Sequence, residues 1–331
     1  MEKIAILIPC YNEAVTIGKV IDDFKHELPE AEIYVYDNNS TDDTGNVARE
    51  HGAIVKREPR QGKGHVTRQM FRDIDADCYV MVDGDDTYNA ADVHAIIAPI
   101  LADEADMVVG DRLTNGSYGK TNTRAFHGFG NALVCGMING LYKADIHDVM
   151  TGYRAFNRVF VRTYPVVSNG FEVETEMTVH ALDKGFRIMQ VPFEYRERPE
   201  GSVSKLNTVG DGLLVLRTIA TLFREYKPMR FFGAIAFVFL VACLGCGIPV
   251  LVEFAQTAFI THVPLAIAAV GCATLAALSV VCGIILDSNA RAVRKQYELQ
   301  VYEVYRALRE EREERFDRAN QQASVGAGGH S

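Results

Sequence analysis

Two long apolar runs near the end of the chain constrain its fold more than any other feature. They cover residues 231–254 and 263–286, and Glu253 is the only charged residue in either run. As a helix, each run would extend roughly 36 Å at ~1.5 Å per residue, which is enough to cross the hydrocarbon core of a bilayer. We therefore predict two transmembrane helices joined by the short linker 255–262.

The basic residues around these runs predict their orientation. Lysines and arginines flank the pair on both sides and are absent from the linker: Arg224, Lys227, Arg230, Arg291, Arg294 and Lys295. By the positive-inside rule, both termini lie in the cytoplasm and the linker lies outside. The chain start, MEKI, lacks a basic region followed by an apolar core, so we expect no signal peptide and a multi-pass protein of the inner (cytoplasmic) membrane.

Composition narrows the function classes. The chain has 331 residues and a formal net charge of −9, which argues against a nucleic-acid partner. Seven cysteines in a chain whose bulk is predicted to be cytosolic are expected to stay reduced.

The first third of the chain alternates predicted strands with predicted helices. Apolar and alternating runs predict strands at 4–9, 32–37, 53–56, 78–82 and 107–110, and helical spacing predicts helices at 14–27, 40–51, 63–74 and 92–101. This order implies an α/β fold with a parallel, three-layer sheet. The sequence has neither GxGxxG after the first strand nor GxxxxGK[ST], which disfavours a dehydrogenase or a P-loop enzyme.

Two segments outside the α/β region and the apolar runs also have helical patterns. Residues 207–230 are amphipathic and precede the membrane, so we expect a helix at the bilayer surface, although a plain packing helix fits equally. Residues 287–331 predict a charged cytoplasmic helical tail that becomes disordered from Gln321. The apolar 3–4 spacing across 297–308 fits a short self-association helix, and thus a homo-oligomer, as well as it fits a solvated helix.

An acidic motif directly follows the predicted strand 78–82. Asp83 and Asp85 are spaced i, i+2 at the end of a core strand, where an open α/β sheet binds ligands. Carboxylate oxygens suit Mg²⁺ or Mn²⁺, which in turn would hold a diphosphate. An acidic turn is the alternative, because Asp and Gly also favour turns.

Two more polar motifs close neighbouring strands, at residues 9–13 (PCYNE) and 37–44 (DNNSTDDT). The carboxyl ends of parallel strands meet at one edge, so all three motifs should converge on one crevice. In their order and joint presence they resemble the family 2 glycosyltransferases of GT-A fold, a Rossmann-like nucleotide-diphospho-sugar transferase fold. Within that family the chain is similar to the polyprenyl-phosphate (dolichyl- or undecaprenyl-phosphate) hexose synthases. The resemblance covers the predicted catalytic domain, residues 1–206.

The resemblance implies a donor site that binds a nucleotide sugar. Its residues would be Pro9, Tyr11, Glu13, Asp37, Asn39, Lys63 and Asp83. Asp83 and Asp85 would hold the metal on the donor diphosphate, whose charge grows as the bond to the anomeric carbon breaks. Lys63 lies in a predicted flexible loop, and a solvated loop lysine is the alternative.

A second motif implies the acceptor side. Residues 148–154 (DVMTGYR) match the family pattern D-x-x-[ST]-G-[FY]-R, which makes Asp148, together with Asp85, a candidate catalytic carboxylate. A lipid phosphate is already ionised at neutral pH, so Asp148 has the alternative roles of orienting the acceptor or binding the metal. Arg154 is either a ligand or a structural ion-pair partner.

Basic residues near the membrane are candidates for gripping a lipid phosphate. Residues 198–205 resemble the family segment R-x-x-G-x-S-K, with one extra residue between the arginine and the lysine. The lipid-phosphate candidates are Arg124, Asn131, Arg198, Ser202 and Lys205. Attraction to anionic head groups is the alternative for these charges. The acidic stretch 171–176 places acids on one helix; the resemblance implies a helix that borders the active site here, and a solvated helix face is the alternative that we favour.

These features predict a metal-dependent, inverting glycosyltransferase that moves a hexose from a nucleotide sugar, with UDP favoured over GDP, to a polyprenyl phosphate. The chain has no tryptophan and thus lacks the Q-x-x-R-W motif of processive relatives, which favours a single transfer. Two alternatives stay open: transfer to another lipid such as diacylglycerol, and a non-enzymatic nucleotide-sugar-binding membrane scaffold. The sequence does not identify the sugar, because one hydroxyl can be read by a single hydrogen bond.

Overall fold

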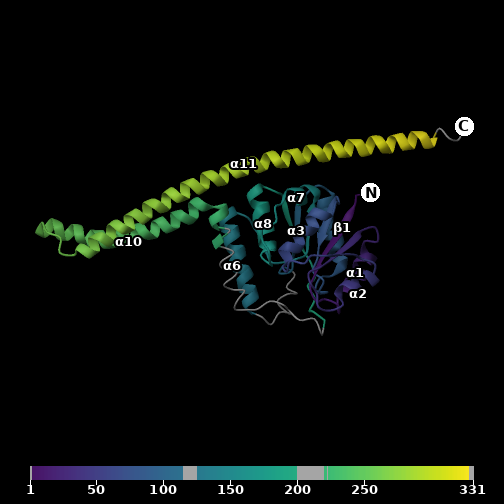
Figure 1. Cartoon of the computed structure of the whole chain (residues 1–331), viewed down its shortest axis with the longest axis horizontal. Coiled ribbons are helices and arrows are strands. Elements are labelled where there is room, and N and C mark those ends of the chain that lie inside the picture. The colour runs from purple at the N-terminus through teal and green to yellow at the C-terminus, as the bar shows by residue number, and fades with distance from the viewer. Residues whose placement is uncertain (1, 115–124, 200–219, 222, 328–331) are drawn as a thin grey trace. The chain divides into compact units, whose positions relative to one another are not determined.

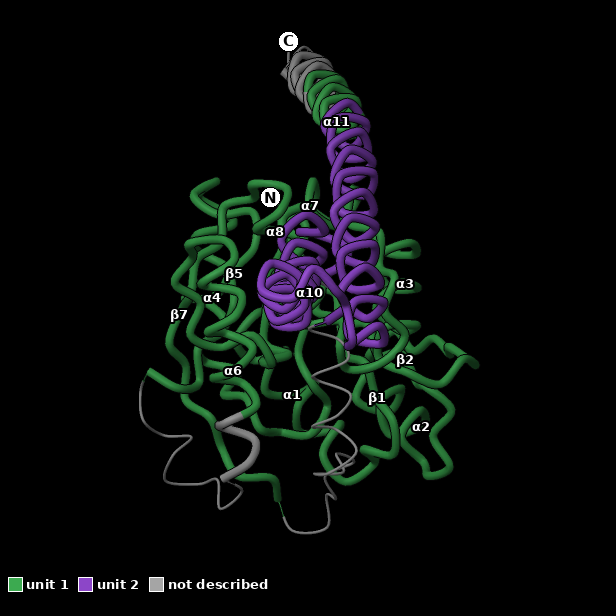
Figure 2. The backbone as a smooth tube through the Cα atoms, turned by 90° about the vertical axis from the view of Figure 1, so that its left-hand side faces the viewer, with its two compact units in different colours: residues 1–215, 300–331 green, residues 216–299 purple. Residues whose placement is uncertain are grey.

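The computed structural model describes residues 2–114, 125–199, 220–221 and 223–327 of the chain. Its contacts divide the chain into two compact units, coloured separately in Figure 2. The first unit is Met1–Val215 with Gln300–Ser331, and the second is Leu216–Leu299.

An α/β sheet with helices on both faces forms the first unit (Figure 1). Its strands are β1 Ile4–Cys10, β2 Glu32–Asp37, β3 Ile54–Arg57, β4 Cys78–Met81, β5 Met107–Asp111, β6 Arg154–Asn157 and β7 Ile188–Pro192. Its α-helices are α1 Ile17–Glu27, α2 Thr44–Glu50, α3 Lys63–Asp73, α4 Val93–Leu101, α6 Ala125–Tyr142, α7 Arg158–Thr163 and α8 Val173–Lys184. The order of the described strands in the sheet is β3-β2-β1-β4-β6-β5-β7.

Most strands of the sheet run parallel, but β6 does not. β1 pairs parallel with β2 and β4, whereas β6 pairs antiparallel with both β4 and β5. The predicted all-parallel order is therefore wrong between β4 and β5. The chain enters β6 directly after the 148–154 motif, at the edge where β4 ends, so β6 must run back through the sheet.

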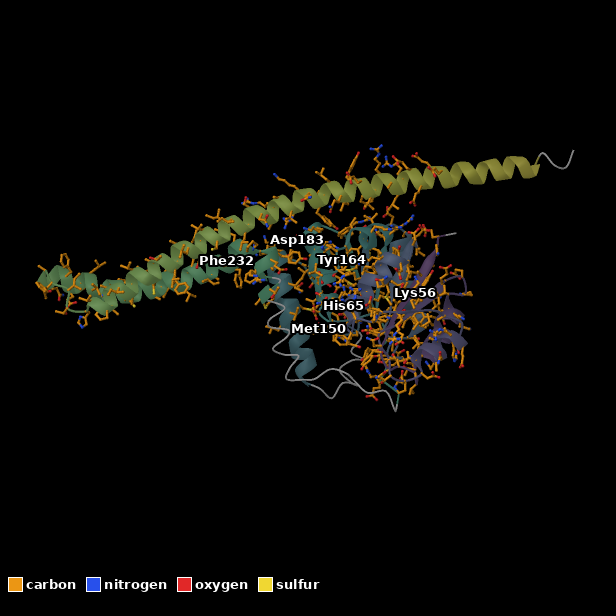
Figure 3. The ribbon with its side chains drawn as sticks, viewed as in Figure 1. Lys56, His65, Met150, Tyr164, Asp183 and Phe232 are labelled. Atoms are coloured by element: carbon orange, nitrogen blue, oxygen red, sulfur yellow. The ribbon has the colours of Figure 1, made fainter. Side chains whose placement is uncertain are left out.

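Alternate residues of the strands pack into two separate cores. In β1, Ile6 and Ile8 pack on the side of α1, α2 and α4, whereas Ala5 and Leu7 pack on the side of α3, α7 and α8. Tyr164, labelled in Figure 3, belongs to the second core. Burial on both faces explains the continuous apolar strands in the sequence, and the predicted three-layer arrangement is confirmed.

Two long helices, α10 Pro228–Thr257 and α11 Val263–Ala327, contain the apolar runs. By length and composition both can cross a membrane, with mean hydropathy of 2.7 and 2.4 in their apolar windows. Large apolar side chains stay exposed on both, as at Phe237 (65%) and Ile267 (67%). α11 extends to Ala327, and the disorder expected from Gln321 stays a prediction.

The expected surface helix at 207–230 falls mostly outside the described residues. Residues 220–221 and 223–226 are helical, and residues 207–219 and 222 lie outside the described part.

Candidate active site

The loops that follow β1, β2 and β4 are joined by hydrogen bonds. The Asn12 backbone N–H donates to Ser40 Oγ at 3.0 Å, which connects the first two loops. The Thr16 hydroxyl donates to the Gly84 carbonyl at 2.6 Å, which connects the first loop to the acidic motif. The predicted convergence of the three motifs on one sheet edge is thus confirmed.

The predicted donor-site residues lie on these loops. The Asp37 carboxylate accepts a hydrogen bond from the Ser40 backbone N–H at 2.9 Å. Asn39 has a left-handed φ of 64° and accepts from the Arg57 guanidinium at 3.2 Å. Pro9 is in β1, opposite Tyr36 of β2. Tyr11 and Glu13 follow β1 in the same loop and are partly buried.

Lys63 is the first residue of α3 and is buried between two carboxylates. Its Nζ lies 2.5 Å from Asp83 Oδ1 and 2.5 Å from Glu174 Oε1, and its side chain is 8% exposed. The expected flexible loop at 62–64 is therefore wrong. Gly62 has a φ of 132°, and a Cβ there would meet the Asn169 carbonyl, so the chain enters α3 through a fixed turn.

Burial and ion pairing together shift the pKa values of Lys63, Asp83 and Glu174. Burial alone would lower the pKa of Lys63, but the two carboxylates outweigh it and raise that pKa. Burial would likewise raise the pKa of Asp83, but Lys63 outweighs it and lowers that pKa. The pKa of Glu174 is raised, mainly by burial. Glu174 Oε2 accepts no hydrogen bond from the described residues.

Asp85 pairs with a second positively charged side chain, that of Arg198. Its Oδ2 lies 2.5 Å from Nη2 of Arg198, and its Oδ1 accepts a hydrogen bond from the Thr87 hydroxyl at 2.6 Å. Burial and the neighbouring charge of Asp83 raise the pKa of Asp85. Arg198, a predicted lipid-phosphate ligand, thus lies on the acidic motif.

Asp83 and Asp85 are the residues of the acidic motif that could hold a divalent cation, and each is paired here with a positively charged side chain. Among the described residues, no group of three or more histidine, cysteine, aspartate or glutamate side chains could hold a metal ion. An ion here would therefore need ligands from phosphate or water, as Mg²⁺ commonly has in nucleotide sites.

Asp148 is completely buried and paired, so it is not an exposed base. Its Oδ2 lies 2.8 Å from Nε of Arg112, and its Oδ1 accepts a hydrogen bond from the Met150 backbone N–H at 3.2 Å. Burial raises the pKa of Asp148, while Arg112 opposes the shift. The side chain that Asp148 orients is Arg112, which directly follows β5 at the same edge of the sheet.

Tyr88 connects the acidic motif to the 148–154 motif. Its hydroxyl donates to Asp83 Oδ2 at 2.9 Å and accepts from the Gly152 backbone N–H at 3.0 Å. Its ring stacks on Tyr153 with centroids 5.2 Å apart. A Cβ on Gly152 would lie 2.5 Å from Asp83 Oδ2, so glycine is required for this approach.

Two other candidates have structural contacts. Arg154 is completely buried and donates to the carbonyls of Thr151 and Val149 at 3.0 and 2.8 Å. The Asn131 amide donates to the His147 carbonyl and accepts from the Val149 N–H, both at 3.2 Å. Both side chains therefore fix the loop that contains Asp148. The contact of Asn131 with a lipid phosphate stays a prediction.

The acidic stretch 171–176 is not a solvated face, contrary to expectation. Glu174 and Glu176 are 4% and 5% exposed. Glu176 accepts hydrogen bonds from the backbone N–H groups of Val167 and Ser168 at 3.1 and 2.8 Å. α8 therefore buries these two acids because each has a partner.

Tyr88 and Arg112 are the functional candidates that the sequence did not single out, whereas Glu174 belongs to the stretch 171–176, for which a solvated face was the favoured expectation. Arg112 could have been found, since it follows a predicted strand at the ligand-binding edge. Three predicted lipid-phosphate residues, Arg124, Ser202 and Lys205, lie outside the described residues.

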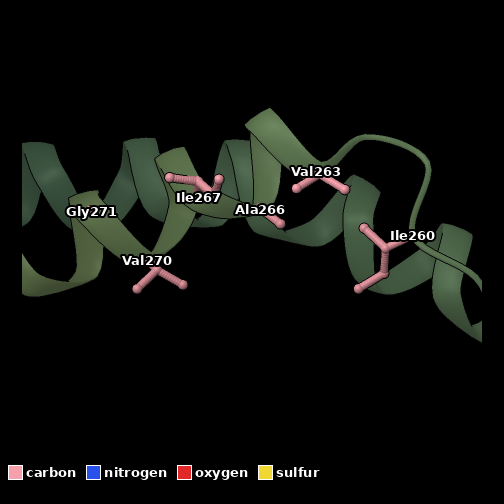
Figure 4. A pocket seen from close by; sticks show the side chains of 6 residues that line it. All are labelled: Ile260, Val263, Ala266, Ile267, Val270 and Gly271. Carbon is pink, nitrogen blue, oxygen red and sulfur yellow. The ribbon is translucent and has the colours of Figure 1, made fainter.

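A hollow of about 540 Å³ lies on the hairpin of the second unit (Figure 4). It is lined by Ile260, Val263, Ala266, Ile267, Val270 and Gly271. None of these side chains can ionise or donate a hydrogen bond, so the hollow offers no group for catalysis.

Comparison with known proteins identifies the family. The sequence profile described as glycosyl transferase family 2 matches residues 5–164. The "Glycosyltransferase AglJ" of Haloferax volcanii is 34% identical over 254 residues, which cover 76% of this chain and 82% of that protein. The chain belongs to glycosyl transferase family 2. It is therefore a transferase enzyme.

Two further relatives extend the comparison of this family 2 glycosyltransferase. The "Dolichyl-phosphate hexose transferase" of Haloferax volcanii is 28% identical over 226 residues, covering 68% of this chain and 96% of that protein. The crystal structure of glucosyl-3-phosphoglycerate synthase from Mycobacterium tuberculosis with Mn²⁺, UDP and glucosyl-3-phosphoglycerate has a TM-score of 0.52. It is 24% identical and covers 68% of this chain and 80% of that one, which shows a common GT-A fold.

Proposed function

We propose that this enzyme transfers a hexose from a nucleotide sugar, preferably a UDP-sugar, to the phosphate of a polyprenyl carrier at the inner leaflet. The observation that carries the proposal is the link made by Tyr88, whose hydroxyl contacts both Asp83 and Gly152. It joins the acidic motif expected to bind the donor to the motif expected to face the acceptor.

On the donor side, the loops after β1 and β2 would bind the nucleotide through Pro9, Tyr11, Glu13, Asp37 and Asn39. Lys63 lies between Asp83 and Glu174, next to these loops. The second oxygen of Glu174 is buried and has no hydrogen-bond donor among the described residues. The UDP bound to a mycobacterial enzyme of the same fold supports a uridine donor.

Asp83 and Asp85 would hold Mg²⁺ or Mn²⁺. When bound, the ion would neutralise the charge that develops on the diphosphate leaving group. Mn²⁺ in the mycobacterial structure supports this choice of cofactor.

On the acceptor side, Arg112 would receive the phosphate of the lipid. Asp148 holds its guanidinium at 2.8 Å and thereby orients it, so Asp148 acts as a positioning residue. No base is needed, because the phosphate is already ionised. Its oxygen would attack the anomeric carbon from the face opposite the diphosphate, and the configuration would invert.

The membrane helices would keep this reaction at the bilayer surface. We assign residues 1–206 to the catalytic domain, 207–230 to a helix at the interface, 231–254 and 263–286 to two spans, and 287–331 to a cytoplasmic tail. Holding the crevice beside the head groups would replace the entropy of finding a lipid-borne acceptor. The name of the dolichyl-phosphate relative supports this class of acceptor.

Purified full-length protein with undecaprenyl phosphate, Mn²⁺ or Mg²⁺, and a panel of UDP- and GDP-sugars tests the proposal. We expect the lipid to gain one hexose unit by mass spectrometry, and we expect EDTA or Asp85→Ala to abolish the gain. Nucleotide-sugar binding without a mass gain for any donor would contradict the proposal. Full biological activity of Asp85→Ala would favour a non-enzymatic scaffold.

A further inference from the structure

Arg198 lies on the acidic motif, although its sequence context predicts a lipid-phosphate ligand. Its guanidinium contacts Asp85 Oδ2 at 2.5 Å, and the other oxygen of Asp85 is held by Thr87. Both oxygens of the proposed metal ligand are therefore engaged by the chain itself. A divalent ion that binds Asp85 must compete with this guanidinium.

The two cations of the acidic motif differ in how firmly they are held. The Lys63 side chain is 8% exposed and lies between two carboxylates. The Arg198 side chain is 29% exposed, and its Nη2 lies 2.5 Å from Asp85. Removing Lys63 would leave two buried carboxylates without their shared cation, whereas displacing the more exposed Arg198 leaves one carboxylate, which the incoming ion itself pairs. An incoming cation should therefore replace Arg198 and leave Lys63 in position.

The segment that carries Arg198 lies beside the proposed acceptor arginine. Tyr195 forms a bridge with Tyr88, and the Arg112 guanidinium lies 5.9 Å from the centroid of the Tyr195 ring. Arg198 follows Tyr195 by three residues, so its segment passes the ring that Arg112 contacts. Two guanidinium groups suit a phosphate, because each can donate two parallel hydrogen bonds.

We propose that Arg198 alternates between Asp85 and the acceptor phosphate, and that the divalent ion drives the exchange by taking Asp85. This inference rests on the proposed function for the identity of the acceptor. When the ion binds Asp85, Arg198 becomes available to the phosphate. When the phosphate binds Arg198, that side chain no longer competes with the ion for Asp85. Ion and acceptor therefore bind with positive coupling, which must be reciprocal.

A Mn²⁺ titration tests the exchange without any lipid substrate. Electron paramagnetic resonance would measure Mn²⁺ binding to the full-length protein in nanodiscs. We expect Arg198→Gln to bind Mn²⁺ about tenfold more tightly than the wild type, if Arg198 occupies Asp85 about nine-tenths of the time. Arg198→Lys keeps the charge and should bind Mn²⁺ like the wild type. Asp85→Asn should abolish Mn²⁺ binding, which would show that the measured signal comes from the ion at Asp85.

Arg196→Gln is the matched control. Arg196 lies on the same segment with the same charge, but its guanidinium donates to Asn89 at 2.7 Å. Its substitution should leave Mn²⁺ affinity unchanged. Equal or weaker Mn²⁺ binding by Arg198→Gln, or tighter binding by both variants, would overturn the exchange at Asp85.

A short-chain polyprenyl phosphate tests the second half of the exchange. It should tighten Mn²⁺ binding in the wild type and in Arg196→Gln, but not in Arg198→Gln. Tightening of equal size in all three would overturn the role of Arg198. The transfer assay reports separately on the proposed function, so a wild type that glycosylates the lipid without this coupling sinks the inference alone. Coupling with inorganic phosphate but not with the lipid would point to a soluble phosphate acceptor and contradict the lipid identity.

Discussion

At the scale of single residues, one hydroxyl joins the two halves of the site. Tyr88 donates to Asp83 and accepts from the Gly152 backbone, so any shift of the 148–154 motif reaches the acidic motif directly. The fit is close because Gly152 has no side chain. Position 152 is thus a sensitive test of the proposed geometry.

Gly152→Ala should impair transfer without unfolding the protein. The added Cβ would lie 2.5 Å from Asp83 Oδ2, and displacing this carboxylate by about 1 Å can lower the rate by roughly 100-fold. Steady-state transfer rates measure the effect. Gly136→Ala in α6 is the control, since nothing lies within 4 Å of the new methyl group. Equal rates for both variants would contradict the proposed role of Asp83.

The site could be predicted from sequence where the signal is local. Asp83 and Asp85 follow an apolar run directly, so their place at a strand end follows from neighbouring residues. The burial of Glu174 could not be predicted from its own segment, because its partner Lys63 lies on a distant helix and only the folded chain brings them together. The pairing that buries Asp148 with Arg112 also depends on tertiary contacts.

At the scale of elements, α8 carries buried ionisable residues, among them Glu174, near the acidic motif, and His180, in the core. The His180 ring lies 5.0 Å from that of Tyr164 and 6.2 Å from that of Phe160, between centroids. Burial, with a smaller effect of Lys184, lowers the pKa of His180 to about 3. The neutral imidazole therefore helps to pack α8 against α7.

This burial predicts a pH-dependent stability. An unfolded histidine has a pKa of about 6.5, so the contribution of His180 is complete above that pH and is lost as the pH falls towards 3. The loss amounts to at most about 1.4 kcal/mol per pH unit, because the unfolded state alone takes up the proton. His180→Phe should therefore show a smaller fall in Tm than the wild type between pH 7 and pH 5. An identical fall would contradict a neutral, buried His180.

The order of strands could be predicted only in part. Helix and strand periodicity predicted β1 to β5 within a few residues, because these elements have strong local patterns. The place and direction of β6 could not be predicted, since a short strand of four residues gives little signal and its partners are set by the sheet.

At the scale of the whole molecule, an α/β catalytic unit is followed by two helices long and apolar enough to span a membrane. The orientation remains a prediction from the positions of lysine and arginine. It requires the loop between α10 and α11 to face away from the cytoplasm.

Labelling of single cysteines in a cysteine-free background tests this orientation. A membrane-impermeant maleimide should label Thr261→Cys in intact cells, because Thr261 lies in the loop between the helices. Ser288→Cys, just past the second predicted span, should react only after permeabilisation. The reverse pattern would contradict a cytoplasmic catalytic unit.

A competition between two acceptor lipids tests the proposed transfer to a polyprenyl phosphate most directly. Equimolar undecaprenyl phosphate and diacylglycerol would be placed in the same nanodiscs as the full-length enzyme, with Mn²⁺ and a radiolabelled UDP-hexose that it accepts. We expect the label to appear on the polyprenyl phosphate alone, because Arg112 and Arg198 are proposed to recognise a phosphate. Label on diacylglycerol, or on neither lipid while the donor is consumed, would contradict it.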